Sequence, residues 1–145
     1  MMSKCKTAGG SKAKLDRVFS RYIRLRDMIG DTKTFRCISC GQIKPIGQAD
    51  CGHYINRQHM ATRFSEVNCH AQCRSCNRFD EGNLQGYRRG LVAMYGEQRV
   101  RILEAMKYEA RKYSEFEFEA LTAHFKKEVE RMLAEKNLKI GDLSE

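Results

Sequence analysis

Four cysteines are arranged in two pairs, and each pair has the form Cys-x-x-Cys. Cys37 and Cys40 make the first pair, and Cys73 and Cys76 make the second. Each pair places two sulfurs on one side of a turn, and four thiolates complete the tetrahedron of a structural zinc site. The alternative, four unligated cysteines buried as small apolar residues, fits the paired spacing less well. The sequence therefore predicts a structural Zn²⁺ held by all four sulfurs.

Side chains of a second chemistry lie beside these pairs. His53 and Asn68 fall between them, and Asn77 directly follows the second pair. A neutral imidazole suits a general base near pH 7, and an amide can tie down its ring or its loop. Oxygen and nitrogen ligands favour Mg²⁺ or Mn²⁺, which can stabilise the leaving 3′-oxygen of a phosphodiester. We expect His53 to be the base, Asn68 its orienter and Asn77 a ligand of a catalytic Mg²⁺ or Mn²⁺.

Other side chains near His53 are candidates with a structural alternative. Asp50 and His59 are expected to bind the catalytic cation, although His59 equally suits a phosphate contact or a plain loop residue. His70 and Asp80 are further candidates for the same cation, but alternation along a strand favours a structural role for His70. The residues expected to be structural or inert are His124, Cys5, Cys51 and Cys69, the last two as core residues or as neighbours across a strand pair. A metal site that uses Cys51 as a ligand is an alternative that fits the spacing less well.

Positive charge is concentrated in the first two stretches of the chain. Residues 1–40 carry ten Lys and Arg against three acids, residues 41–90 seven against four, and residues 91–145 ten against eleven. A solvated basic surface alone would explain this, but the excess flanks the candidate site and favours a phosphate backbone as partner. The arginines expected to contact DNA phosphates are Arg17, Arg21, Arg24, Arg57 and Arg63; a solvated helix face is an equal alternative for the first three.

The apolar spacing predicts a single α+β domain over residues 12–136. Residues 1–11 are rich in Gly, Ser and Lys and are expected to be a disordered tail, and residues 137–145 a frayed one. Helical spacing predicts a basic amphipathic helix over residues 12–30. Residues 33–82 are expected to form the zinc-bound core, with short strands over 35–38, 53–55 and 68–72 and then a helix after Cys76. The long connection between the last two strands carries Arg57, His59 and Arg63.

Residues 83–136 are predicted to be helical. A break is expected near residues 81–83, followed by helices to Gly96 and from Glu97 to Lys112. Ser114 to Glu117 has the form of a capping box, which starts a last helix. One stripe of that helix carries Phe118 and Phe125, which could join two copies in a homodimer; packing inside one chain is the favoured alternative.

Composition also bears on location. The sequence has no apolar stretch of 18 residues and no hydrophobic signal region at its start, so no membrane association is expected. Its seven cysteines are an odd number, and four of them are paired as metal ligands, which favours a reducing cytoplasm over a disulfide framework.

The arrangement of His53, Asn68 and Asn77 between and beside the cysteine pairs resembles the HNH, or ββα-metal, nuclease pattern. Many members place Asp or His directly before the base, whereas this chain has Gly52. Over residues 12–135 the chain more specifically resembles the NinG/Rap family of phage recombination endonucleases. The segments that carry this resemblance are Asp50-Cys51-Gly52-His53-Tyr54-Ile55, Arg57, Arg63-Phe64, Asn68, Gln72-Cys73, Cys76-Asn77, Gly82-Asn83, Tyr87-Arg88, Gly96 and Lys112-Tyr113-Ser114.

The resemblance implies a zinc-bound ββα-metal, treble-clef-like core with an N-terminal helix and a C-terminal helical segment. It implies a phage or prophage endonuclease in the bacterial cytoplasm that cuts Holliday junctions and displacement loops and leaves a 5′-phosphate and a 3′-hydroxyl. Phage recombination proteins are its implied partners. Two other functions stay open: a non-catalytic zinc-ribbon DNA-binding adaptor, and an RNA nuclease or RNA-binding protein.

Overall fold

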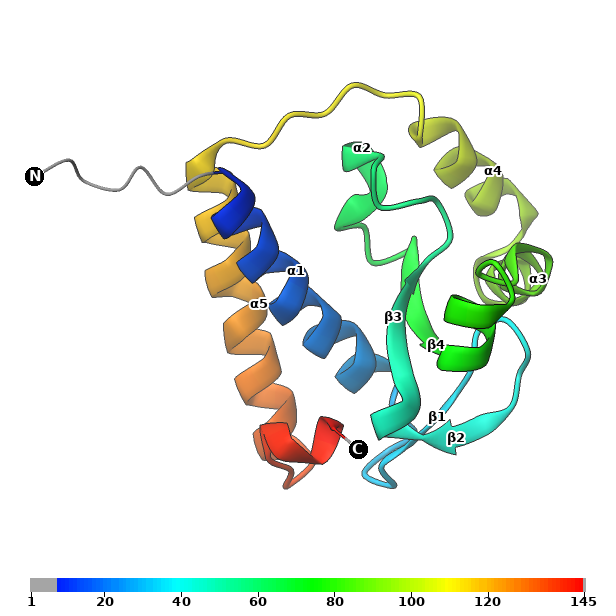
Figure 1. Cartoon of the computed structure of the whole chain (residues 1–145), viewed down its shortest axis with the longest axis vertical. Helices are drawn as coiled ribbons and strands as arrows, with labels where there is room; N and C mark the ends of the chain where they lie inside the picture. Colours follow the sequence, from blue (N-terminus) through cyan, green and yellow to red (C-terminus); the bar gives the residue numbers. More distant parts are fainter. Residues whose placement is uncertain (1–7, 145) are drawn as a thin grey trace, which may run out of the picture.

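The computed structural model describes residues 8–144, which combine helices with two small antiparallel sheets (Figure 1). This is a mixed α+β arrangement, as predicted. None of the helices within these residues is long and apolar enough to cross a membrane. In chain order the elements are α1 (Ala8–Asp27), β1 (Thr34–Arg36), β2 (Ile43–Pro45), η1 (Ile46–Gln48), β3 (Ala49–His53), α2 (Met60–Arg63), β4 (Cys69–Cys73), η2 (Ser75–Phe79), α3 (Leu84–Tyr95), α4 (Glu97–Met106), α5 (Glu115–Glu135) and η3 (Ile140–Leu143).

The two long helices, α1 and α5, pack side by side and run in the same direction (Figure 1). The ring centroids of Phe19 and Phe125 lie 5.0 Å apart, and Leu15 and Ile23 are fully buried between the helices and the rest of the core. Burial of such side chains is the main force that holds two helices together. Phe118 is buried as well. Phe118 and Phe125 of α5 therefore pack inside the chain, which is the arrangement favoured over a homodimer contact.

Both ends of the domain differ from the tails predicted by composition. Helix α1 begins at Ala8, and the buried hydroxyl of Ser11 donates to Glu115 of α5. At the other end, Leu143 in η3 is only 2% exposed, and its carbonyl accepts a hydrogen bond from Arg24 at 3.1 Å. Composition cannot predict either contact, because the two partners of each lie more than 100 residues apart along the chain. Residues 1–7 and 145 lie outside the described part.

Two antiparallel pairs present the candidate residues. The β1–β2 hairpin carries the first cysteine pair beyond β1, and β3 pairs with β4 so that His53 lies directly opposite Cys69. The strand predicted at residues 53–55 instead covers Ala49 to His53, because Cys51 and Gly52 have little intrinsic preference for a strand and tertiary pairing places them there. His53 is thus the last residue of β3.

The helix predicted after Cys76 is a short π-helical segment, η2. It is followed by Glu81, Gly82 and Asn83, which have φ values of 47°, 82° and 41°, a backbone region that a right-handed helix cannot use. The break predicted near residues 81–83 is therefore confirmed. Asn83 then caps α3 by accepting a hydrogen bond from the main-chain N–H of Gly86 at 3.3 Å.

Helices α3 and α4 form a second small core on the far side of the β3–β4 sheet. Tyr87, Leu91 and Val100 are fully buried there. Helix α4 ends at Met106 rather than near Lys112, and residues 107–114 cross above the sheet to α5 (Figure 1). The capping box is confirmed, since the side chains and main-chain amides of Ser114 and Glu117 bond reciprocally at 3.1 and 3.3 Å.

Candidate functional site

The four paired cysteines come together where the β1–β2 turn meets the end of β4. Their sulfur atoms all lie within 4.8 Å of one another, and the Cys40 and Cys73 sulfurs are 3.9 Å apart. A tetrahedral zinc with bonds of about 2.3 Å would separate its sulfurs by about 3.8 Å. The Cys37, Cys40, Cys73 and Cys76 cluster could therefore hold a metal such as zinc, at the residues that the spacing predicts.

Nearby N–H groups support the metal-binding form of these thiols. The main-chain N–H of Cys73 lies 3.3 Å from the Cys37 sulfur, and the Asn83 amide lies 3.4 Å from the Cys76 sulfur. Burial alone would raise the pKa of Cys37, but main-chain N–H groups, led by that of Cys73, lower it overall. Such hydrogen bonds favour a thiolate, which is the form that ligates a metal.

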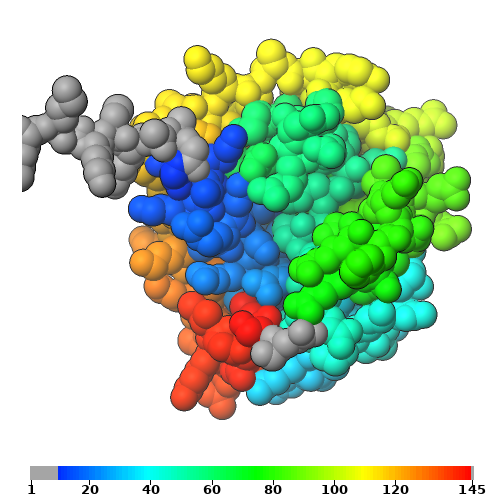
Figure 2. Space-filling model, in the orientation of Figure 1, coloured from blue at the N-terminus to red at the C-terminus, as the bar shows by residue number. Residues whose placement is uncertain are grey.

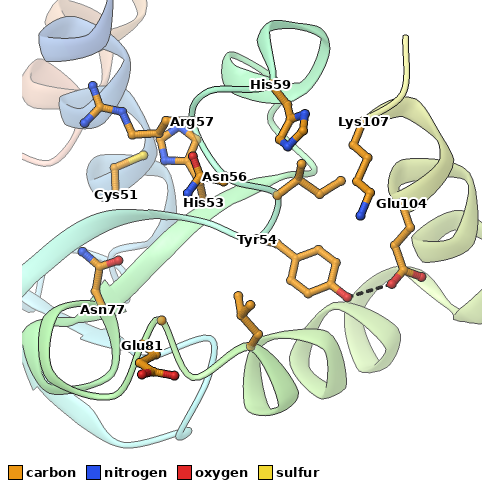
Figure 3. A pocket seen from close by; sticks show the side chains of 13 residues that line it. Cys51, His53, Tyr54, Asn56, Arg57, His59, Asn77, Glu81, Glu104 and Lys107 are labelled. Carbon is orange, nitrogen blue, oxygen red and sulfur yellow. Dashed lines mark hydrogen bonds between the residues drawn. The ribbon is translucent and has the colours of Figure 1, made fainter.

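His53 lies between two connected hollows on the exposed side of β3. One cavity of about 600 Å³ extends toward α4, and another of about 480 Å³ lies against α1. Figure 2 shows the surface hollowed between α1 in blue and the green segment that contains η2 and α3, and Figure 3 shows the larger cavity from close by. The residues that line both cavities are Cys51, His53, Arg57 and Asn77.

A main-chain carbonyl orients the imidazole of His53. The Nε2 atom lies 3.0 Å from the carbonyl oxygen of Arg63. Because a carbonyl can only accept, Nε2 carries the hydrogen and Nδ1 carries the lone pair. Burial lowers the pKa of His53, the Arg63 carbonyl offsets this in part, and the guanidinium groups of Arg57 and Arg63 lower it further. The ring is therefore neutral near pH 7, as a general base must be.

Asn68 holds the loop rather than the ring. It is fully buried, and its side-chain oxygen accepts from the Ile55 N–H at 2.8 Å. Its amide nitrogen donates to the carbonyls of Ile55 and Thr62 at 3.0 and 3.1 Å. Of the two expected roles, tying down the ring or the loop, the structure shows the second: Asn68 fixes the backbone next to Arg63, whose carbonyl accepts from the ring. Asn68 is a positioning residue.

Asn77 presents an oxygen to the larger cavity. Its nitrogen donates to Asp50 at 2.9 Å, so its carbonyl oxygen is turned toward the cavity (Figure 3). Arg78 binds both carboxylate oxygens of Asp50 at 2.8 and 2.7 Å. These bonds outweigh the effect of burial and lower the pKa of Asp50. Asp50 therefore holds Asn77 in place and would have to release Arg78 to bind a cation itself. The candidate Asp80 is exposed and lines neither cavity.

Close packing against Gln72 explains why the residue directly before His53 is a glycine. A Cβ at Gly52 would lie 2.1 Å from Oε1 of Gln72, which is far inside van der Waals contact. Gln72 is buried, and its amide nitrogen donates to the hydroxyl of Ser39 at 2.8 Å and the carbonyl of Gly82 at 2.6 Å. The position that carries Asp or His in many HNH sequences is therefore closed to any side chain here.

Three of the four arginines of α1, Arg17, Arg21 and Arg24, line the smaller cavity. Arg17 is exposed, and Arg21 and Arg24 are partly buried. Arg24 also donates to the carbonyls of Ser20 and Leu143, so its position is set by the C-terminal segment. All three belong to α1, so they form one wall of this cavity.

The two loop arginines differ from each other. Arg57 has a side chain that is 56% exposed and lies 3.1 Å from Asp16. Arg63 is buried and binds both oxygens of Asp16, at 3.0 and 2.6 Å. The predicted phosphate contact of Arg63 is therefore wrong, because its guanidinium forms an ion pair with Asp16 that connects α2 to α1. The spacing of residues along the chain does not indicate that Arg63 pairs with Asp16.

The three remaining histidines differ in their positions and contacts. His59 directly precedes α2 and lines the larger cavity, but it shares no close group of three ligand atoms with Asp50 among residues 8–144. His70 is buried, with Nε2 2.9 Å from the hydroxyl of Tyr95, and takes the structural role expected of it. His124 is exposed on α5, with its ring 5.0 Å from that of Phe125.

Cys51 and Cys69 are neighbours across the strand pair, which is one of the two arrangements predicted for them. The ligand atoms of Cys51, His53 and Cys69 all lie within 4.8 Å of one another. Cys69 is fully buried, and its sulfur lies 3.5 Å from the carbonyl oxygen of Arg63. Burial, helped by the Cys51 thiol, raises the pKa of Cys69 well above its ordinary value. The spacing of these cysteines along the chain does not indicate that they lie beside His53; the β3–β4 pairing brings them there.

Comparison with known proteins places the chain in a family. The "Protein ninG" of Escherichia phage lambda is 38% identical over 85 residues, which is 58% of this chain and 39% of that relative. The "Protein ninG" of Salmonella phage P22 is 40% identical over 76 residues, or 52% and 34% of the two chains. This chain thus spans about two fifths or less of the length of these curated relatives.

No solved structure matches the chain. The profile of the family described as "Bacteriophage Lambda NinG protein" matches residues 2–135, which is nearly the whole chain. The chain therefore belongs to the NinG family of bacteriophage proteins.

Proposed function

We propose that this protein is a metal-dependent DNA endonuclease of the HNH type. The observation that carries the proposal is the state of His53: its Nε2–H is committed to the Arg63 carbonyl, and its ring lines a cavity shared with the oxygen ligand Asn77. A neutral imidazole with one nitrogen fixed and the other carrying a lone pair is suited to take a proton from water. The basic wall beside it suits a phosphate backbone.

In the proposed reaction, Nδ1 of His53 removes a proton from a water molecule in line with the scissile phosphorus. The bond from water oxygen to phosphorus forms as the bond to the 3′-oxygen breaks. The leaving 3′-oxygen takes a proton from solvent, which gives a 5′-phosphate and a 3′-hydroxyl, and His53 later returns its proton to solvent. The Arg63 carbonyl stabilises the imidazolium that results, because it already accepts from the opposite ring nitrogen.

Asn77 and Glu81 are the oxygen donors proposed to hold Mg²⁺ or Mn²⁺. Both residues line the larger cavity. Hard oxygen ligands fit these ions, whereas the four thiolates fit zinc. When bound, such a cation supplies positive charge that stabilises the leaving oxygen. Asp50 contributes by fixing the amide of Asn77, and His59 is a further candidate contact on the far wall.

The arginines are proposed to hold DNA across the two hollows. Arg17 and Arg21 line the side next to α1, and Arg57 lies between the cavities. Lys107, the residue directly after α4, adds a further positive group. Positive charges on both sides of His53 suit a substrate with more than one duplex arm. The resemblance to the NinG/Rap family narrows the proposed substrates to four-way junctions and displacement loops.

The test is a nicking assay on a four-way junction and on linear duplex DNA, with Mg²⁺ or Mn²⁺. The native protein should cut the junction, and His53→Ala should lose at least about 100-fold in rate while keeping its zinc. His124→Ala is the matched control, because that histidine is exposed on α5 outside both cavities.

Other outcomes would contradict the proposal. Binding of junctions without cleavage, across metals and substrates, would instead support a zinc-ribbon DNA-binding adaptor. Preferential binding or cleavage of duplex RNA in direct competition would assign the site to RNA.

A further inference from the structure

The sheet that carries the proposed base also brings two thiols to it. His53 and Cys69 are directly opposed in the β3–β4 pair, and Cys51 precedes His53 by two residues on the same strand. Directly paired residues, and residues two apart on one strand, point to the same face of a sheet. This is why their three ligand atoms lie within 4.8 Å of one another.

The three side chains form a pocket that is closed at one end and open at the other. Cys69 is fully buried, whereas Cys51 and His53 are partly exposed and line both cavities. An ion can therefore reach the set from solvent and be enclosed by Cys69. The ligand group is defined with either ring nitrogen of His53. Because Nε2 donates to the Arg63 carbonyl, the lone pair of the neutral ring is on Nδ1, and an ion held by this set would bind the ring there. The available donors are thus two sulfurs and one nitrogen, with a fourth position toward the cavity.

We propose that Cys51, His53 and Cys69 form a second metal site, which takes a thiolate-seeking cation such as Zn²⁺ or Cd²⁺ and is separate from the four-cysteine centre. Two thiols and an imidazole select such ions over Mg²⁺, and three protein ligands with an open fourth position are a familiar zinc geometry. Binding releases the two thiol protons to solvent and forms two metal–sulfur bonds and one metal–nitrogen bond.

Occupation of this site would block the proposed nuclease. The ion takes the same Nδ1 lone pair that must accept a proton from water, so the base is removed while the metal is bound. This part of the inference rests on the proposed function, whereas the metal site itself does not. Excess zinc should therefore inhibit Mn²⁺-dependent cleavage, and a chelator that removes only the second ion should restore it.

The binding test counts metal in the reduced, zinc-loaded full chain after addition of Cd²⁺ and gel filtration. Zinc plus cadmium should total two per native chain. Cys51→Ser and His53→Ala should each hold one, with weakening of the second ion by at least about tenfold. Cys5→Ser removes a cysteine outside the described residues and should still hold two. A total of one in the native chain, or of two in both site variants, would overturn the second site.

Cleavage supplies an independent readout. Zinc beyond one equivalent should inhibit native protein at concentrations at least about tenfold lower than those that inhibit Cys51→Ser, which retains the base. Equal inhibition of both proteins, or activation by the second ion, would overturn the inhibitory role. If the metal counts are as expected but no substrate is ever cut, the site stands and the proposed nuclease function fails.

Discussion

The carbonyl oxygen of Arg63 accepts a hydrogen bond from Nε2 of His53 at 3.0 Å, while the guanidinium of the same arginine binds both carboxylate oxygens of Asp16. One residue thus connects the proposed base to α1. The buried ion pair fixes the end of α2, and the end of α2 fixes the tautomer of the imidazole. Although Arg63 was predicted to grip phosphate, it therefore serves the site through its main chain.

Replacing Asp16 should damage both stability and the position of the base. Asp16→Ala leaves the buried Arg63 without its carboxylate, and we expect a loss of about 2 kcal/mol in the free energy of unfolding. Cleavage should fall more than DNA affinity does, because the carbonyl that orients His53 shifts. Urea unfolding and single-turnover rates measure the two effects. Asp31→Ala, an exposed acid just beyond α1, is the control, and equal effects of both variants would refute the connection.

Gly52 should not tolerate a side chain. In Gly52→Ala the new Cβ meets Gln72 Oε1, and Gln72 cannot swing away without losing two hydrogen bonds. We expect a loss of about 1–3 kcal/mol, measured by chemical denaturation. Gly141→Ala places its Cβ in open space and should change stability little. If both substitutions were equally tolerated, the close approach of Gln72 would be wrong.

Loss of the four-cysteine metal should unfold the domain. Binding of a structural zinc contributes about 10–16 kcal/mol in small zinc domains, which is comparable to the total stability of roughly 5–15 kcal/mol of a typical domain. Cys76→Ser should therefore lower bound zinc and abolish cooperative thermal unfolding, whereas Cys5→Ser should do neither. Metal analysis with circular dichroism tests this. A Cys76→Ser protein that unfolds like the native one would show that the cluster is not structural.

Acid should destabilise the fold through His70. Burial, reinforced by Arg26, lowers the pKa of His70 to about 4, compared with 6.5 when unfolded. Because the unfolded chain then binds more protons, stability should fall as the pH drops from about 6.5 to about 4, by up to about 3 kcal/mol. His70→Phe should flatten this part of the pH dependence, whereas His124→Ala should preserve it. Unfolding curves over this pH range decide the matter, and an unchanged slope in His70→Phe would contradict it.

Arg57 should act on DNA and little on stability. Its side chain is more than half exposed, so Arg57→Ala should change the free energy of unfolding by no more than about 0.5 kcal/mol. It should weaken junction binding and reduce the slope of log affinity against log salt by about 1, as expected for one lost phosphate contact. Arg101→Ala, on the exposed face of α4, should alter neither quantity. Equal salt slopes for native and Arg57→Ala proteins would exclude the contact.

Local patterns were sufficient for the metal cluster and most of the helices. The Cys-x-x-Cys spacing indicates the sulfur cluster because two residues between cysteines already place both sulfurs on one turn. The capping box at Ser114 and the break at residues 81–83 are also local, since each depends on side-chain and backbone preferences within a few residues. Strand limits were less predictable, because Ala49 to Gly52 become a strand only by pairing with β4.

The sequence by itself determined which groups are available for chemistry: four paired thiols, one histidine followed by two asparagines, and a basic first half. Only the tertiary structure decided how they are used. Asp16 forms an ion pair with Arg63, and Gln72 fills the space next to Gly52. Asn68 bonds to the backbone of the loop between β3 and β4. The register of these two strands brings Cys51 and Cys69 to His53. The physical reason is that hydrogen bonds and ion pairs act over a few ångströms in space, and residues that meet at that distance can be far apart in sequence.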